Sequence, residues 1–216
     1  MSYAIHKQTY SGGRAYRYRV MDEAGNVHYL AEPSGLLRPT PTRLVEFFDP
    51  DHNRVGRLQP SEEAWWRHTK RYQVFMGDET EESYAEIREF LRMIDLLLLR
   101  LPYYEVQLGR YDYVALGSRY GERFYEIFRL HGGDAEEVAQ EPAGEVGVNE
   151  AVEQGQETRA QSKRAPHPSE TRNRVGQIQR PPSGPSYVIE TDAAPLRQAL
   201  AVLAALVILI DLALTA

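Results

Sequence analysis

Apolar and polar residues alternate along most of the first half of the chain, in short runs separated by turn-forming residues. This period of two is typical of half-buried β-strands, because successive side chains of a strand point to opposite faces of a sheet. Turn formers gather in Ser11–Gly13, Asp22–Asn26 and Asp49–Asn53 and predict hairpin connections. The predicted strands are Tyr3–Thr9, Tyr16–Met21, Val27–Ala31, Leu44–Phe48, Val55–Leu58, Tyr72–Met76, Ala85–Phe90, Tyr103–Leu108, Tyr113–Leu116, Phe124–Phe128 and Tyr187–Glu190.

Short strands at a spacing of about 8–12 residues indicate a β-sandwich or a β-barrel. Three segments depart from the alternation. Pro33–Pro41 predicts an irregular connection, and Ser61–His68 predicts one helical turn with a serine cap. Leu91–Leu101 is continuously apolar, so that it fits either a short buried helix or strands. We favour strand, turn and strand there, since Pro102 restricts the residue before it to an extended conformation.

Residues 140–174 differ in composition from the rest of the chain. They contain no Phe, Tyr or Trp and are rich in Glu, Gln, Ala, Gly, Pro and Ser. Such a segment cannot bury enough apolar surface to offset the entropy of ordering it. We therefore predict a disordered insertion.

An internal echo, a sequence similarity between two segments of the chain, suggests where that insertion lies. Phe47-Phe48 followed by Arg54–Pro60 resembles Phe124-Tyr125 followed by Arg174–Pro181. The first copy is joined by a tight turn, and the second would be the same hairpin opened at its tip, where insertions are tolerated. Two related halves are consistent with a barrel built by duplication.

The C-terminal run Ala199–Ala216 is the most apolar part of the chain. It fits three structures: a helix buried on all sides in the protein core, a membrane tail anchor, or a helix lying at a membrane interface. Asp211 inside the run and the lack of a following Lys or Arg count against the anchor. The absence of a polar face counts against the interfacial helix. We favour the buried helix over residues 195–214, with Asp192 as N-cap and Pro195 in the first turn.

Charge and cysteine content exclude several classes of function. The net charge is −6, so no global basic field attracts nucleic acid. The chain contains 0 Cys, which excludes disulfides, thiolate metal sites and a cysteine nucleophile. Met1–Lys7 has no apolar stretch of the kind found in signal peptides. These features favour a cytoplasmic protein.

No constellation of catalytic residues stands out. The 6 His are scattered without a metal-ligand spacing, and there is no nucleophile elbow, phosphate loop or dinucleotide fingerprint. Asp95 and Asp211 lie in apolar surroundings that can raise a carboxyl pKa, but a buried carboxylate that meets an arginine or backbone groups is the commoner arrangement. We expect no enzyme activity, no cofactor and no metal.

One basic and aromatic cluster is a candidate for lipid headgroup contact. Amphipathic tryptophan beside cations suits a membrane interface with anionic lipids. The alternative is purely structural, with tryptophan packed on the end of the barrel under arginine stems. The candidate residues are Trp65, Trp66, Arg67, Lys70 and Arg71.

The order of these elements resembles the tubby-like C-terminal barrel, nearest to its LURF-one-related and phospholipid scramblase-like groups. The resemblance is carried by Tyr113–Gly117, Phe124–Ile127, Val175–Ile178, Tyr187–Glu190 and the final apolar helix with Ile210-Asp211. It implies a closed antiparallel β-barrel of twelve strands around a buried hydrophobic C-terminal helix, formed by residues 1–216 as a single domain. It also implies binding to lipid or to a membrane surface.

Departures from the family pattern limit what the resemblance implies. Scramblases carry a cysteine cluster and an acidic calcium-binding segment before the last helix; this chain has no Cys and offers only Glu190 and Asp192 there. We therefore expect a non-enzymatic binding or scaffold module, cytoplasmic or peripheral at the membrane. The alternatives are a tail-anchored protein with a cytoplasmic β-domain and a lipid-scrambling activity. No protein partner can be named.

Overall fold

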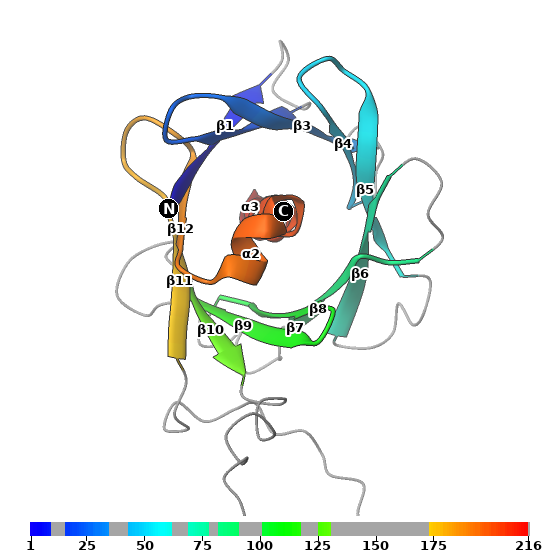
Figure 1. The fold of residues 1–216 in the computed structure, drawn as a ribbon, viewed down its shortest axis with the longest axis vertical. Helices are drawn as coiled ribbons and strands as arrows, with labels where there is room; N and C mark the ends of the chain where they lie inside the picture. Colours follow the sequence, from blue (N-terminus) through cyan, green and yellow to red (C-terminus); the bar gives the residue numbers. More distant parts are fainter. Residues whose placement is uncertain are drawn as a thin grey trace, which may run out of the picture.

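The computed structural model describes residues 1–9, 16–34, 43–61, 69–77, 82–90, 101–117, 125–130 and 173–215. These residues form a closed β-barrel with a helix on its axis (Figure 1). The strands are β1 (Ser2–Thr9), β2 (Tyr16–Asp22), β3 (Val27–Ser34), β4 (Leu44–Phe48), β5 (Arg54–Pro60), β6 (Thr69–Met76), β7 (Ala85–Phe90), β8 (Tyr103–Leu108), β9 (Tyr111–Gly117), β10 (Tyr125–Leu130), β11 (Asn173–Gln179) and β12 (Tyr187–Thr191). The helices are α2 (Ala194–Gln198) and α3 (Leu200–Thr215).

Each strand pairs with its neighbours in sequence, and β1 closes the barrel against β12. All of these pairings are antiparallel. Successive connections therefore alternate between the two ends of the barrel. We name them the Asp192 end, where the chain turns from β12 into α2, and the Asp211 end, where α3 finishes beside the last residues of β1. The predicted fold class is confirmed.

The period of two in the sequence becomes the inside and outside of the barrel. Along β7, the burial alternates strictly from Ala85 to Phe90, and Ile87 is completely buried. The inward side chains of the other strands pack in the same way around α3 and form one continuous core. Six tyrosines belong to the most deeply buried side chains: Tyr18, Tyr72, Tyr104, Tyr113, Tyr125 and Tyr187.

Helix α3 fills the axis of the barrel (Figure 1). From Ala201 to Asp211 no residue exposes more than 2% of its surface. The helix is apolar on every side because strands surround it on every side. Each buried Leu, Ile or Val contributes about 1.5–3 kcal/mol, so this segment is a main source of stability. The buried-helix interpretation of the C-terminal run is confirmed.

The entry into the helix differs from the prediction. Ala193, not Asp192, is the N-cap of α2, and no side-chain hydrogen bond caps the first turn of the helix. The amide of Asp192 instead donates to the carbonyl of Val175 on β11, 3.0 Å away, which holds the residue against the sheet. Pro195 lies in the first turn, as expected. The helix then breaks at Ala199, where the backbone leaves the helical region (φ −99°, ψ 46°) and α3 begins in a new direction.

Proline-containing strands are longer than predicted. β3 continues through Pro33, which pairs with Val45 of β4, and β5 continues to Pro60, which pairs with Tyr72 of β6. Proline lacks an amide donor and is tolerated where only one side of a strand is paired. The pairing of β3 with β2 stops at Ala31, so the missing amide breaks no hydrogen bond of the ladder.

The internal echo corresponds to equivalent positions in the two halves of the barrel, with a corrected alignment. Gly56 of β5 faces Phe47 of β4 beside a β-bulge at Val55, and Gly176 of β11 faces Ile127 of β10 beside a β-bulge at Val175. Ile127-Phe128 therefore matches Phe47-Phe48, and Phe124-Tyr125 does not. A Cβ at either glycine would lie 2.6–2.7 Å from a carbonyl oxygen of the next strand. Both copies therefore need glycine at this position.

Several predictions fall outside the described residues. These are the strand, turn and strand of residues 91–100, Asp95 among them, the helical turn of residues 62–68, and residues 140–172 of the insertion. Asn173 and Arg174 belong to β11 and not to the predicted insertion. The strand begins there because Asn173 and Arg174 already pair with Arg129 and Phe128 of β10.

Candidate functional site

Asp211 forms the centre of a buried polar cluster near the end of α3. Its Oδ2 accepts hydrogen bonds from Lys7 Nζ at 2.6 Å and from the Tyr18 hydroxyl at 2.7 Å, and its Oδ1 accepts one from the Tyr187 hydroxyl at 2.7 Å. The carboxylate is 1% exposed and the Lys7 side chain 15%. Strands β1, β2 and β12 supply these donors at one level of the barrel, so that the last turns of α3 are tied to the wall.

Burial by itself would raise the pKa of Asp211, since desolvation disfavours the charged form. The hydrogen bonds from Lys7, Tyr18 and Tyr187 and the charge of Lys7 outweigh this effect and hold the pKa below its ordinary value. The raised pKa that apolar surroundings suggested is therefore wrong. The carboxylate is a satisfied anion, not a proton donor.

A second buried cluster surrounds Glu89 on β7. Arg43, just before β4, forms an ion pair with Glu89 and donates to the Tyr72 hydroxyl at 2.7 Å. The Tyr72 hydroxyl in turn donates to Glu89 Oε2 at 2.9 Å. Glu89 is 4% exposed. A buried charge is tolerated only when it is paired and hydrogen-bonded, and here both conditions are met.

Two further tyrosines lie beside the Glu89 cluster. The Tyr125 hydroxyl donates to the carbonyl of Pro102 at 3.1 Å, whereas the Tyr104 hydroxyl has no hydrogen-bond partner among the described residues. Burial, and then the negative charge of Glu89, raises the pKa of both phenols. Both phenols therefore stay protonated at neutral pH.

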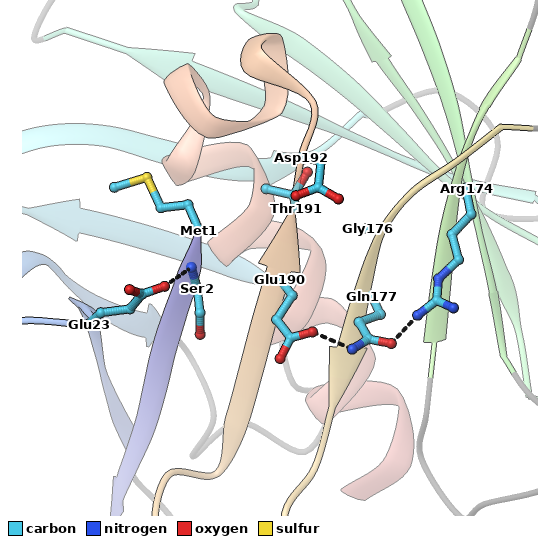
Figure 2. A pocket seen from close by; sticks show the side chains of 9 residues that line it. All are labelled: Met1, Ser2, Glu23, Arg174, Gly176, Gln177, Glu190, Thr191 and Asp192. Atoms are coloured by element: carbon cyan, nitrogen blue, oxygen red, sulfur yellow. Dashed lines mark hydrogen bonds between the residues drawn. The ribbon is translucent and has the colours of Figure 1, made fainter.

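An open pocket of about 500 Å³ lies near the Asp192 end, over β1, β12 and β11 (Figure 2). Ser2, Glu190 and Gln177 stand side by side in register across these strands. Glu190 accepts a hydrogen bond from Gln177, and Gln177 accepts one from Arg174. Several polar groups that line this pocket therefore form hydrogen bonds with one another.

The described residues offer no metal site: no three His, Cys, Asp or Glu among them gather in an arrangement that could hold an ion. Glu190 and Asp192, the acidic residues that precede α2, both line the pocket of Figure 2 and are exposed. In both buried clusters, tyrosine hydroxyls donate hydrogen bonds to a carboxylate that is also paired with a cation. The chemistry of these groups is that of fixed ion pairs.

The predicted headgroup-contact residues are only partly described. Trp65, Trp66 and Arg67 lie outside the described residues. Lys70 and Arg71 are the second and third residues of β6, where Lys70 is exposed and Arg71 is half-buried. Their partners across the ladder are Glu89 and Arg88 of β7. β6 starts at the Asp211 end, so these two cations lie at the same end of the barrel as Lys7 and Arg43.

Sequence reasoning missed the Glu89 cluster, although a signal was present. In Ala85–Phe90 the alternation puts Glu89 on the same face as Ala85 and Ile87, which indicates a buried carboxylate. Its partner Arg43 lies 46 residues away in the chain, and no local pattern links the two. Lys7, Tyr18 and Tyr187 could not be assigned to Asp211 for the same reason.

No helix in the described part of the chain is both long enough and apolar enough to cross a membrane. Comparison with protein-family models, with curated proteins and with solved structures finds no match to this chain. The resemblance to tubby-like barrels and to their LURF-one-related and scramblase-like groups therefore stays a prediction.

Proposed function

We propose that this protein is a non-catalytic binding module that attaches, on the cytoplasmic side, to membrane surfaces with anionic lipid headgroups. The observation that carries the proposal is the start of β6. There the exposed Lys70 and the neighbouring Arg71 follow closely on Trp65, Trp66 and Arg67 in sequence. Each Lys or Arg near an anionic surface contributes about 1 kcal/mol, and tryptophan favours the interface.

The filled interior supports a surface role. Helix α3 occupies the axis of the barrel and is buried from Ala201 to Asp211. A ligand of drug size needs a pocket of several hundred Å³, and the barrel uses that space for its own chain. Binding at the outer surface or at one end is the function that this architecture leaves open.

The test is co-flotation of the protein with vesicles. Wild type should bind vesicles that contain phosphatidylserine and not vesicles of phosphatidylcholine alone, and binding should weaken with salt because the attraction is electrostatic. The variants Lys70→Ala/Arg71→Ala and Trp65→Ala/Trp66→Ala should each lose about tenfold or more in affinity.

The matched control is Arg19→Ala, an exposed cation in the middle of β2. It should bind like wild type. The proposal fails if wild type binds neither kind of vesicle, or if all variants bind as the control does.

A further inference from the structure

Acidic residues are concentrated in the turns of the Asp192 end. The turn between β2 and β3 carries Asp22 and Glu23, and the turn between β4 and β5 carries Asp49 and Asp51. Glu82, just before β7, and the exposed Asp192 lie at the same end.

Cations at the Asp192 end do not cancel this charge. Arg54 and Arg174 each form an ion pair with a strand glutamate, Glu46 at 3.7 Å and Glu126 at 3.3 Å. Arg110 lies over the ring of Tyr111, 5.1 Å from its centroid. Arg129 lies over the same ring, 4.9 Å from its centroid, and Arg197 is exposed. The described acidic groups of this end, Glu46 and Glu126 included, outnumber these five cations.

The Asp211 end has the opposite character. Among the described residues, six cations lie at or beside the strand ends there, and Asp211, Glu32 and Glu89 are each paired, with Lys7, Arg17 and Arg43 respectively. Among the described residues of this end the cations outnumber the acids, and two of these cations, Lys70 and Arg180, are exposed. The cations are Lys7, Arg17, Arg43, Lys70, Arg71 and Arg180.

The composition of the remaining connections has the same polarity. The sequence between β6 and β7, at the Asp192 end, contains Asp78, Glu79 and Glu81 without a cation. Outside the described residues, the sequences that join strands at the other end contain seven Arg against four acidic residues, Glu62, Glu63, Asp95 and Glu122. Charge thus changes sign along the barrel axis, from acidic at one end to basic at the other.

From this polarity we infer that the barrel docks end-on upon an anionic bilayer, with the Asp211 end facing the lipid and the Asp192 end pointing away. The inference rests on the proposed function and adds the orientation to it. A planar anionic surface attracts the basic end and repels the acidic one, and this orients the molecule before contact. A nucleic acid is a poorer partner, because a net charge of −6 repels a long polyanion that extends past the basic end.

Two charge-reversal variants with the same net charge separate orientation from overall charge. Lys70→Glu/Arg180→Glu changes two exposed cations of the Asp211 end, and Arg110→Glu/Arg197→Glu changes two exposed cations of the Asp192 end. The first variant should lose at least about tenfold in affinity for phosphatidylserine vesicles, and the second should stay within about twofold of wild type. Thermal melting should show that both are folded. Equal losses in the two variants would overturn the inference.

A second measurement reads the orientation directly and needs no loss of binding. The chain has 0 Cys, so single cysteines can carry a fluorophore: Gln8→Cys at the Asp211 end and Asp51→Cys at the Asp192 end, both exposed. A quencher on the lipid headgroups should quench the label at position 8 and leave the label at position 51 nearly unchanged.

The remaining outcomes are distinct. If wild type binds but the label at position 51 is quenched as strongly as that at position 8, the orientation is wrong and the proposed function stands. If wild type binds no vesicle, both are wrong. Binding to a single-stranded RNA probe without vesicle binding would show that the basic end serves a nucleic acid, which also overturns the inference.

Discussion

At the scale of single residues, two buried carboxylates tie distant parts of the chain together. Asp211 links α3 to β1, β2 and β12, and Glu89 links β7 to β6 and to the residue before β4. The sequence predicts that Asp211 is unusual, because a carboxylate in an apolar run demands a partner. It cannot predict which partners, since Lys7 and Asp211 are 204 residues apart.

The first prediction concerns Asp211 and pH. Its pKa is lower in the folded protein than in the unfolded chain, so its contribution is fully present above the unfolded value near 4. That contribution is lost as the pH falls through the lowered folded pKa. Asp211→Asn should reduce the free energy of unfolding by about 3–5 kcal/mol at pH 7, because it leaves Lys7 without its counter-charge.

Urea unfolding of wild type and Asp211→Asn at pH 7 and at pH 2.5 checks this prediction. The difference between the two proteins should shrink at the lower pH as the wild-type carboxyl begins to be protonated. A difference that does not change with pH would show that Asp211 contributes by packing and not by charge.

The second prediction compares two buried tyrosines. Tyr72→Phe removes a hydroxyl that donates to Glu89 and accepts from Arg43, and should cost about 1–3 kcal/mol. Tyr104→Phe removes a hydroxyl with no partner among the described residues, so it should be neutral or slightly stabilising. Chemical denaturation of both variants measures the two values, and a larger loss in Tyr104→Phe would contradict the description of the cluster.

At the scale of elements, two hairpin turns have the same pattern of hydrogen bonds. In Asp22–Asn26 and in Asp49–Asn53, the aspartate accepts hydrogen bonds from the amide and the side chain of the asparagine four residues later. For Asp22 these bonds lower the pKa to about 2. The fourth residue of each turn has a positive φ: 84° at Gly25 and 66° at His52.

The third prediction follows from that difference. A side chain strains the left-handed conformation by about 1–2 kcal/mol, whereas glycine adopts it freely. His52→Gly should therefore stabilise the protein by about 0.5–1 kcal/mol, and Gly25→Ala should destabilise it by about 1–2 kcal/mol. Thermal melts of both variants provide the measurement; a loss of stability in His52→Gly would show that the imidazole makes a contact worth more than the strain.

Strands were predicted better than their ends. Leu44–Phe48, Ala85–Phe90 and Tyr103–Leu108 have the predicted bounds, because alternation and turn residues are local signals. The extension of β3 through Pro33 depends on which side of the strand is paired. Asp192 does not cap the helix because its amide donates to the carbonyl of Val175 on β11. Both are set by neighbours that lie elsewhere in the chain.

At the scale of the whole molecule, the barrel is built around its own C-terminus. An apolar helix on the axis explains why a chain with 26% charged residues contains the run Ala199–Ala216 without Lys or Arg. Composition and strand spacing are compatible with a β-sandwich as well as with a β-barrel. The prediction of a closed barrel came from the resemblance to the tubby-like family. The charge polarity between the two ends could not be predicted, because it appears only when the alternation of connections in a closed antiparallel barrel is known.

The most direct test of this account is native-state hydrogen exchange of α3. If the helix is the core of the barrel, its amides from Val202 to Asp211 should exchange only by global unfolding, as slowly as the best protected strands. Their protection should be unchanged when anionic vesicles are added. Exchange of α3 at the rate of a frayed helix, while the strands stay protected, would contradict the account and would show that the barrel folds without it.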